Sequence, residues 1–244
     1  MTTLSTATND QQAQKPMQLW IDILIVVATS VVAFGLENLA FSEGRLPFGE
    51  QIRGAFSVVC GAVAAVSVVF ARGGSFTELG LRVPASWTRS IMQALVILFV
   101  FVLAQAVVPM MLALFIDLPA ADFSRYDVIA GNLPAAISMA LILPITASIP
   151  EEIIYRGFLM GRLTEFFGKD SRGSILTVLV QAIIFGSIHF QWGLGGMIMT
   201  VIMGVVWGTA FILCGRNLWV VILAHSAGHL LFVSQLYFAV TVVA

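Results

Sequence analysis

Apolar runs long enough to cross a membrane recur along this chain, and they limit what it can fold into. A helix that spans the hydrocarbon core needs about 20 mainly apolar residues. In lipid, only helices and closed barrels satisfy their own backbone hydrogen-bonding groups. We therefore predict an all-α fold, a polytopic bundle of about seven transmembrane helices, within a range of about six to eight. The predicted spans are residues 18–40, 54–71, 90–116, 133–160, 174–190, 196–214 and 218–242.

The composition agrees with a membrane protein and excludes one class of partner. Hydrophobic residues make up 59% of the chain and charged residues only 10%, whereas a soluble domain is about 25% charged. The formal net charge is −1, so the chain lacks the basic surface that binds nucleic-acid phosphates. We expect membrane lipids around the protein and no nucleic-acid partner.

The polar segment 1–16 precedes the first apolar run, and we predict a disordered tail there, followed by a transmembrane domain at 17–244. Lysines and arginines divide unevenly between the two sides of the predicted membrane. Nine lie on the side of the N-terminal tail, and three, Arg45, Arg53 and Arg125, lie on the other. Because cytoplasmic loops are enriched in these residues, we expect a cytoplasmic N-terminus.

The fourth apolar run carries charges where the chain would cross the bilayer. Such charges are costly and mark functional positions. Glu152 and Arg156 are four residues apart, so they share a helical face and can pair. Glu151 lies about 100° away around the helix and has no cation at the corresponding position. Pro144 and Pro150 in the same run predict kinks, because each removes a backbone hydrogen bond.

All three histidines of the chain lie in apolar segments. His225 and His229 are four residues apart, which places both imidazoles on one helical face, a common metal-ligand geometry. His189 lies in another predicted span. We predict that these side chains meet Glu151 in an intramembrane cavity and activate water there. Either the glutamate acts directly as general base, or the imidazoles hold a metal. The use that we expect is hydrolysis of a peptide bond.

Three stretches of the C-terminal half, EEIIYR, FGSIH and NLWVVILAHSAGH, occur in this order. They resemble the motifs EExxxR, FxxxH and HxxxN of the CAAX-protease and bacteriocin-processing family (CPBP, or Abi) of intramembrane proteases. The resemblance covers about residues 135–235, which we take as the catalytic core. It implies an intramembrane endopeptidase that acts on a protein or peptide substrate, in CAAX-type or leader or signal processing.

The resemblance also implies a role for each matching residue. Glu151 would activate the water, with His189 as its partner on the water or the metal. His225 would be a further ligand or would stabilise an oxyanion. Glu152 and Arg156 would support the site.

The chain departs from the family at His229, where the last motif usually ends in Asn or Asp. A neutral histidine can donate a hydrogen bond from one ring nitrogen or can ligate a metal. Two roles are therefore open for His229: an oxyanion donor, or a Zn²⁺ ligand together with Glu151, His189 and His225. The mechanism is accordingly that of a metalloprotease or of a glutamate-dependent protease.

Two other classes of function are alternatives to the protease. A non-catalytic membrane scaffold or bacteriocin-immunity protein would keep the fold, but it would have no need of intact Glu151, His189 and His225. A small-solute transporter would use the same polar residues as a relay. Against it, the second half of the sequence does not resemble the first, whereas such a likeness is the usual mark of inverted-repeat transporters. No motif in the chain identifies the substrate.

Overall fold

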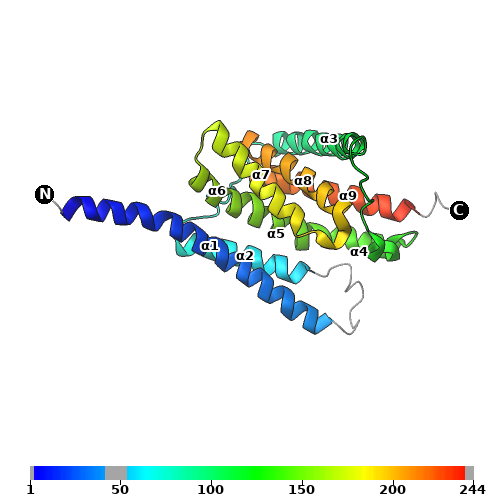
Figure 1. Ribbon diagram of the computed structural model, residues 1–244. Helices are drawn as coiled ribbons and strands as arrows, with labels where there is room; N and C mark the ends of the chain where they lie inside the picture. The colour runs from blue at the N-terminus through cyan, green and yellow to red at the C-terminus, as the bar shows by residue number, and fades with distance from the viewer. Residues whose placement is uncertain (1–2, 42–53, 240–244) are drawn as a thin grey trace.

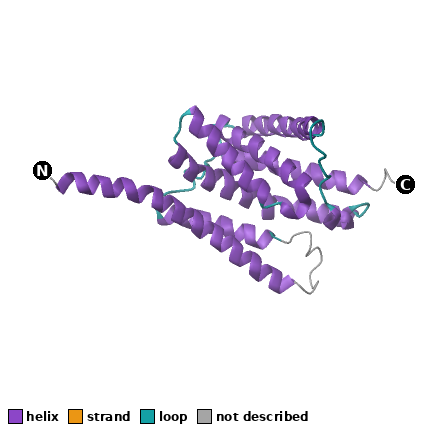
Figure 2. Cartoon of the chain, viewed as in Figure 1, coloured by secondary structure: helices purple, strands orange, loops and turns teal. Residues whose placement is uncertain are grey.

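The computed structural model describes residues 3–41 and 54–239 of the chain. Helix accounts for 81% of the structure, and the described residues contain no strand (Figure 2). The predicted all-α fold is confirmed.

Two of the seven predicted spans are shorter than a membrane crossing requires. They correspond to α2 (Ala55–Ala71) and α7 (Ser171–Ser187), with 17 residues each, or about 25 Å of helix against a core of about 30 Å. The exact count of seven spans is therefore not confirmed. Five helical segments of the described chain are long and apolar enough to cross: Met17–Ala40, Trp87–Leu112, Leu133–Phe167, Phe190–Leu213 and Leu218–Phe238.

The first helix, α1 (Thr3–Phe41), begins inside the polar segment 1–16 that the sequence predicted to be a disordered tail. The structure differs from the prediction here. Extending an existing helix adds one hydrogen bond per residue and needs no new nucleus, so the helix of the first apolar run continues back into polar sequence. Residues 240–242, the end of the last predicted span, lie outside the described residues.

The helices form two sides with a central segment between them (Figure 1). On one side α1 pairs with α2 along most of its apolar part. On the other side α3 (Trp87–Leu112) lies against α8 (Gly193–Leu213) and α9 (Leu218–Phe238). The segment 133–167 runs between the two sides and contacts both α2 and α9. Its side chains are therefore the ones most enclosed by protein.

Small residues bring α7 and α8 close together. A Cβ on Gly204 would lie 2.7 Å from the Cα of Ala182, and one on Gly186 would lie 2.9 Å from the carbonyl oxygen of Met197. Such residues let the backbones of membrane helices approach, which strengthens their packing. This contact fixes the end of α7, from which His189 extends.

Two short 3-10 helices and their aromatic side chains meet at one end of the bundle. They are η1 (Ser124–Ile129) and η4 (Phe190–Trp192). The ring of Phe123 lies 5.4 Å from that of Trp192 and 5.1 Å from that of Phe232 on α9, in edge-to-face contacts. These contacts join the connection before α4 to the connection before α8, and they close that end of the bundle.

Candidate active site

The segment that carries the two glutamates alternates between α-helix and π-helix. Pro144 begins the first π-helical part, and Pro150 lies in the short α-helical turn that follows. Because a proline has no N–H to donate, it interrupts the α-helical hydrogen bonds, and the kinks predicted here take the form of wide π turns. Such turns are rare in proteins as a whole, and many of those that occur lie at functional sites. The five parts are α4 (Leu133–Leu143), η2 (Pro144–Ser148), α5 (Ile149–Glu152), η3 (Ile153–Leu159) and α6 (Met160–Phe167).

Glu152 is fully buried, and one of its oxygens holds two partners. Oε1 accepts a hydrogen bond from Nη1 of Arg156 at 2.9 Å, which is the pair predicted from their spacing. The same oxygen lies 2.8 Å from Nδ1 of His225 on α9. Arg156 is also fully buried and lies over the ring of Phe185, 4.7 Å from its centroid. A carboxylate oxygen that pairs with a guanidinium accepts hydrogen bonds, so we assign the donor proton of this contact to Nδ1 of His225.

Glu151 has a different environment from its neighbour. Its side chain has no hydrogen-bond partner among the described residues and is slightly exposed, at 10%. Its closest basic atom is Nε2 of His225, 3.9 Å from Oε2, which is longer than a hydrogen bond. Nε2 of His225 is itself buried without a partner. Two groups that can bind a proton therefore face each other without being bonded.

His189 lies just beyond the C-terminal end of α7. Its Nδ1 is 2.8 Å from the carbonyl oxygen of Phe185. A carbonyl oxygen can only accept, so Nδ1 carries the proton and Nε2 has a free lone pair. The imidazole ring is held between Phe185 and Trp192, at 4.9 and 4.7 Å between ring centroids. Its tautomer and its orientation are both fixed by these neighbours.

His229 lies one turn beyond His225, and the two rings are 4.6 Å apart. Nδ1 of His229 is 2.8 Å from Oγ of Ser148. The Ser148 hydroxyl has no other acceptor among the described residues, so it donates to Nδ1. The proton of a neutral His229 is then on Nε2, which makes that nitrogen a hydrogen-bond donor.

A cavity of about 690 Å³ lies beside these side chains, between α1, α2, the central segment and α9. Its walls are mainly apolar, with Val26, Phe34 and Phe158 among them. Glu152 and Arg156 are absent from its lining and lie behind Glu151 and His225. The predicted site residues that line the cavity are Glu151, His189, His225 and His229. We call these four, with Glu152 and Arg156, the intramembrane centre.

The comparisons with known proteins bear on this part of the chain. Residues 133–231 match the family model described as type II CAAX prenyl endopeptidase Rce1-like. Neither the curated proteins nor the solved structures include a match to the chain.

The Rce1-like segment holds the whole intramembrane centre, and its limits agree with the core predicted at about 135–235. The family implies protease activity. Together with the apolar helices, it identifies an integral membrane protein. The helices α1, α2 and α3 precede the Rce1-like segment, although α1 and α2 supply part of the cavity wall.

Sequence reasoning missed Ser148 in the Rce1-like segment. A signal was present, because Ser148 lies three residues before Glu151 in a run that is mainly apolar. Residues three apart on a helix share a face, so a hydroxyl at this position falls next to the site. Its partner His229 is 81 residues later, and no local rule connects the two.

The Zn²⁺ predicted from the sequence stays a prediction. The described residues contain no group of three or more His, Cys, Asp or Glu side chains arranged to hold a metal ion. In each histidine of the centre, Nδ1 has a protein partner already: Glu152, Ser148 or the carbonyl of Phe185. As arranged, the side chains do not form a ligand set, and we derive no chemical step through a metal.

Proposed function

We propose that the chain is an intramembrane endopeptidase in which Glu151 acts as general base toward water. The observation that carries this proposal is the contrast within one pair of neighbours. Glu152 is held by Arg156 and His225, whereas Glu151 faces the cavity with no hydrogen-bond partner among the described residues. A carboxylate in that position can take a proton from a water molecule as the water attacks a peptide carbonyl.

The histidines at the cavity orient the water in this proposal. His189 and His225 both donate from Nδ1, so each presents the lone pair of Nε2. A water molecule beside Glu151 can then donate one proton to the carboxylate and direct the other to an imidazole. Its oxygen lone pair is left free to attack. Fixed acceptors of this kind lower the entropy cost of orienting the water toward the peptide carbonyl.

His229 supplies the oxyanion donor. With its Nδ1 accepting from Ser148, the Nε2–H group is free to donate to the oxygen that becomes negative during attack. This is the role that an amide donor would have at the family's usual Asn. Ser148 acts through His229 and does not touch the substrate, so it is a positioning residue.

The proposed hydrolysis needs only the peptide and one water molecule, and it regenerates Glu151. Water oxygen bonds to the carbonyl carbon, and its proton passes to Glu151. The tetrahedral intermediate then breaks its C–N bond, and Glu151 returns the proton to the departing nitrogen. The products are a carboxylic acid and an amine, and the glutamate is again ionised.

We propose an apolar substrate segment, because the cavity walls on α1 and α2 are apolar. Ile23, Val27 and Val31 of α1 line one side, where a lipid chain or an apolar peptide end would lose contact with water. The family description names CAAX prenyl endopeptidases, and a lipid-modified C-terminus has the chemistry that such walls accept.

Glu151→Gln tests the proposal even before a substrate is identified. Peptide termini are compared between membranes that contain the wild-type protein and membranes that contain the variant at equal amounts. New termini should arise with wild type only, and uncut precursors should be captured with Glu151→Gln. Glu165→Gln, the same change at an exposed carboxylate outside the centre, should behave as wild type. Identical termini with and without Glu151 would favour the non-catalytic scaffold.

We further propose that the N-terminus faces the cytoplasm. Arg156 was counted among the nine cations of that side, but it is buried in the intramembrane centre. Eight against three remain, and the bias keeps its direction. Arg45 and Arg53 of the opposite side lie outside the described residues. A cysteine introduced in segment 3–16 should resist membrane-impermeant labels in intact cells. Rapid labelling there would reverse the orientation.

A further inference from the structure

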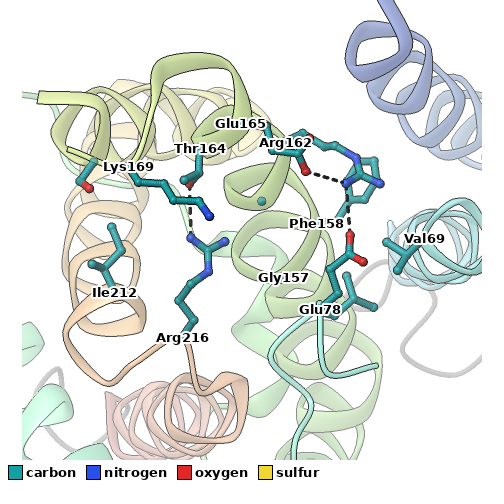
Figure 3. A pocket seen from close by; sticks show the side chains of 13 residues that line it. Val69, Glu78, Gly157, Phe158, Arg162, Thr164, Glu165, Lys169, Ile212 and Arg216 are labelled. Atoms are coloured by element: carbon teal, nitrogen blue, oxygen red, sulfur yellow. Dashed lines mark hydrogen bonds and ion pairs between the residues drawn. The ribbon is translucent and has the colours of Figure 1, made fainter. Parts of the chain in front are cut away.

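A second pocket lies at the end of the bundle where α6 ends and α7 begins, away from the intramembrane centre (Figure 3). Its volume is about 440 Å³, and the residues that line it are largely polar or charged. They come from α2 and the loop after it, from η3, α6 and the α6–α7 turn, from the start of α7, and from the end of α8 and the turn after it. None of them belongs to the proposed catalytic machinery.

The carboxylates on one side of this pocket are already paired with arginines. Nη1 of Arg162 lies 3.4 Å from Glu78 and 3.3 Å from Glu165. Its Nε lies 3.2 Å from Asp22 on α1, which also binds Arg72 at 2.7 Å. Figure 3 shows Glu78 and Glu165 directed at Arg162. We call these five residues the end cluster. Because its acids already have arginine partners, the two remaining cations of the pocket lining give that lining a formal charge of +1.

The cations on the other side have no such partners. Lys169 and Arg216 both line the pocket, and neither has a carboxylate within ion-pair distance in the described part of the chain. Nη1 of Arg216 donates to Oγ1 of Thr164 at 3.3 Å. Burial lowers the pKa of the Arg216 guanidinium from its ordinary value. The side chain has therefore lost part of its water without gaining a counter-charge, and Figure 3 shows Lys169 reaching into the same space.

The backbone holds Arg216 in this position. Its φ is 58°, the only positive φ of a non-glycine residue in the described chain, and such a conformation is uncommon outside glycine. Its N–H donates to the carbonyl of Phe211 at 2.7 Å, and its guanidinium lies 5.2 Å from the ring of that residue. The turn and the ring together direct the side chain to the pocket.

The floor of the pocket is open at Gly161. A Cβ at this position would meet only Nη2 of Arg216, at 3.9 Å. At Gly157, one turn earlier, a Cβ would lie 2.9 Å from the backbone of Leu79. Gly157 thus serves the packing of the chain, while the space above Gly161 is available to a ligand.

We propose that this pocket binds a phosphate group between Lys169 and Arg216, carried by a phospholipid headgroup or free in solution. A guanidinium, an ammonium and the hydroxyl of Ser174 are donors that phosphate oxygens accept from. The Thr164 hydroxyl already donates to the carbonyl of Met160, so it helps to hold Arg216 and does not bind the phosphate. Basic pockets between membrane helices bind anionic headgroups in this way. The proposal does not depend on protease activity, and binding is measured without it.

The test uses the full chain in a detergent without charged headgroups. Short-chain phosphatidylglycerol, short-chain phosphatidylcholine and inorganic phosphate are titrated separately, and the half-saturating concentration is read from the stabilisation against heat. Phosphatidylglycerol acting at concentrations at least about tenfold lower than phosphate would assign a lipid headgroup. Equal potency of the two would assign a free phosphate. Phosphatidylcholine should act more weakly than phosphatidylglycerol because its ammonium group cancels the charge.

Three substitutions decide whether the effect arises in this pocket. Lys169→Gln and Arg216→Gln should each weaken binding about tenfold, the loss expected for a charge-assisted hydrogen bond. Arg172→Gln removes the same charge from an exposed residue outside the pocket and should leave binding unchanged. Lys169 is exposed, so its variant folds even if Arg216→Gln does not.

Gly161→Val tests the same pocket without removing any charge. The added side chain fills the floor of the pocket and should weaken binding as the charge variants do. The proposal is overturned if no phosphate compound stabilises the protein. It is also overturned if Lys169→Gln and Arg216→Gln bind as wild type does, or if Arg172→Gln weakens binding as much as Lys169→Gln.

Discussion

The intramembrane centre and the end cluster both place arginines next to carboxylates, but they use these side chains for different purposes. In the end cluster, one guanidinium, that of Arg162, contacts three carboxylates, and Arg72 supports one of them. In the centre, Arg156 holds Glu152 alone, and Glu151 is left without a partner although it is less exposed than Glu78 or Glu165.

Burial makes this difference informative. Leaving a charge unpaired costs little at a surface and a great deal in a low-dielectric interior. A fold that pairs the partly exposed acids of the end cluster but leaves Glu151 free accepts that cost at the cavity. Perturbed, unpaired groups in a cavity are typical of functional sites. The predictions below break one cluster or the other and compare the results.

Glu151→Gln should have the largest effect of these substitutions. It should lower the rate of turnover and leave stability nearly unchanged. Loss of a general base lowers turnover by about 10²–10⁴-fold. Folding should be nearly unchanged, because Glu151 has no hydrogen bond to lose. Turnover of a captured substrate and the midpoint of thermal unfolding are measured on the same preparation. A large fall in the midpoint would mean that Glu151 supports the fold and would contradict its separation from Glu152.

Arg156→Ala should have the largest effect on stability. It leaves Glu152 buried beside His225 without its cation, and breaking a buried pair costs about 3–5 kcal/mol in soluble proteins. Arg72→Ala is the matched control, since it also removes a guanidinium from an aspartate or glutamate. Arg72 is 43% exposed, so its loss should cost at most about 1 kcal/mol. Equal losses in denaturant unfolding would remove the distinction between the two clusters.

Ser148→Ala should have an intermediate effect that appears in kcat and not in KM. Without the hydroxyl, the proton of His229 can move to Nδ1, and Nε2 then ceases to donate to the oxyanion. We expect a loss of about tenfold, less than the about 10²–10³-fold cost of removing one oxyanion donor, because the imidazole itself is retained. Ser148→Thr, which keeps the hydroxyl, should restore kcat. A change in KM alone would indicate a role in binding only.

His229→Asn and elemental analysis separate the two roles left open for His229. If the side chain is an oxyanion donor, asparagine should replace it with little loss. If it is a Zn²⁺ ligand, the variant should contain less metal than the wild type. Active wild-type protein without stoichiometric zinc would rule out the zinc prediction.

Glu78→Gln in the end cluster should have the smallest effect. Its pair with Arg162 is 3.4 Å long and its side chain is 48% exposed, so about 0.2–1 kcal/mol of stability is expected. That loss should shrink in about 1 M salt, where the screening length is about 3 Å. The loss in Arg156→Ala should persist in the same salt, because the centre excludes ions. Salt-sensitive destabilisation in both variants would contradict this comparison.

Much of the fold and of the centre could be predicted from local rules. Hydropathy located the long apolar helices, because a segment in lipid must satisfy its backbone hydrogen bonds within itself. Spacing predicted the pair of Glu152 and Arg156 because four residues are one turn. The contact of Glu152 with His225 joins positions 73 residues apart, and it depends on how α9 packs. Residue spacing contains no such information.

Charges near helix ends were harder to place. Asp22 lies in the first apolar run, where the sequence alone indicates an acid near the membrane surface. The structure buries it to 3% exposure between Arg72 and Arg162, which come from two other helical segments. Its role is set by two partners far away in the chain, and hydropathy contains no information on partners.

The π-helical turns on either side of the glutamates make the centre depend on a count of residues as well as on their identity. A π turn contains one residue more than the α turn that it replaces. Deleting any one residue of Ile153–Leu159 could restore regular α-helix and preserve every charged group except where Arg156 itself is removed. A deletion between Glu152 and Arg156 would nevertheless shorten their spacing from four residues to three and alter the geometry of their buried pair. The extra residue of the π turn therefore determines how the catalytic side chains are placed relative to the helix that anchors them.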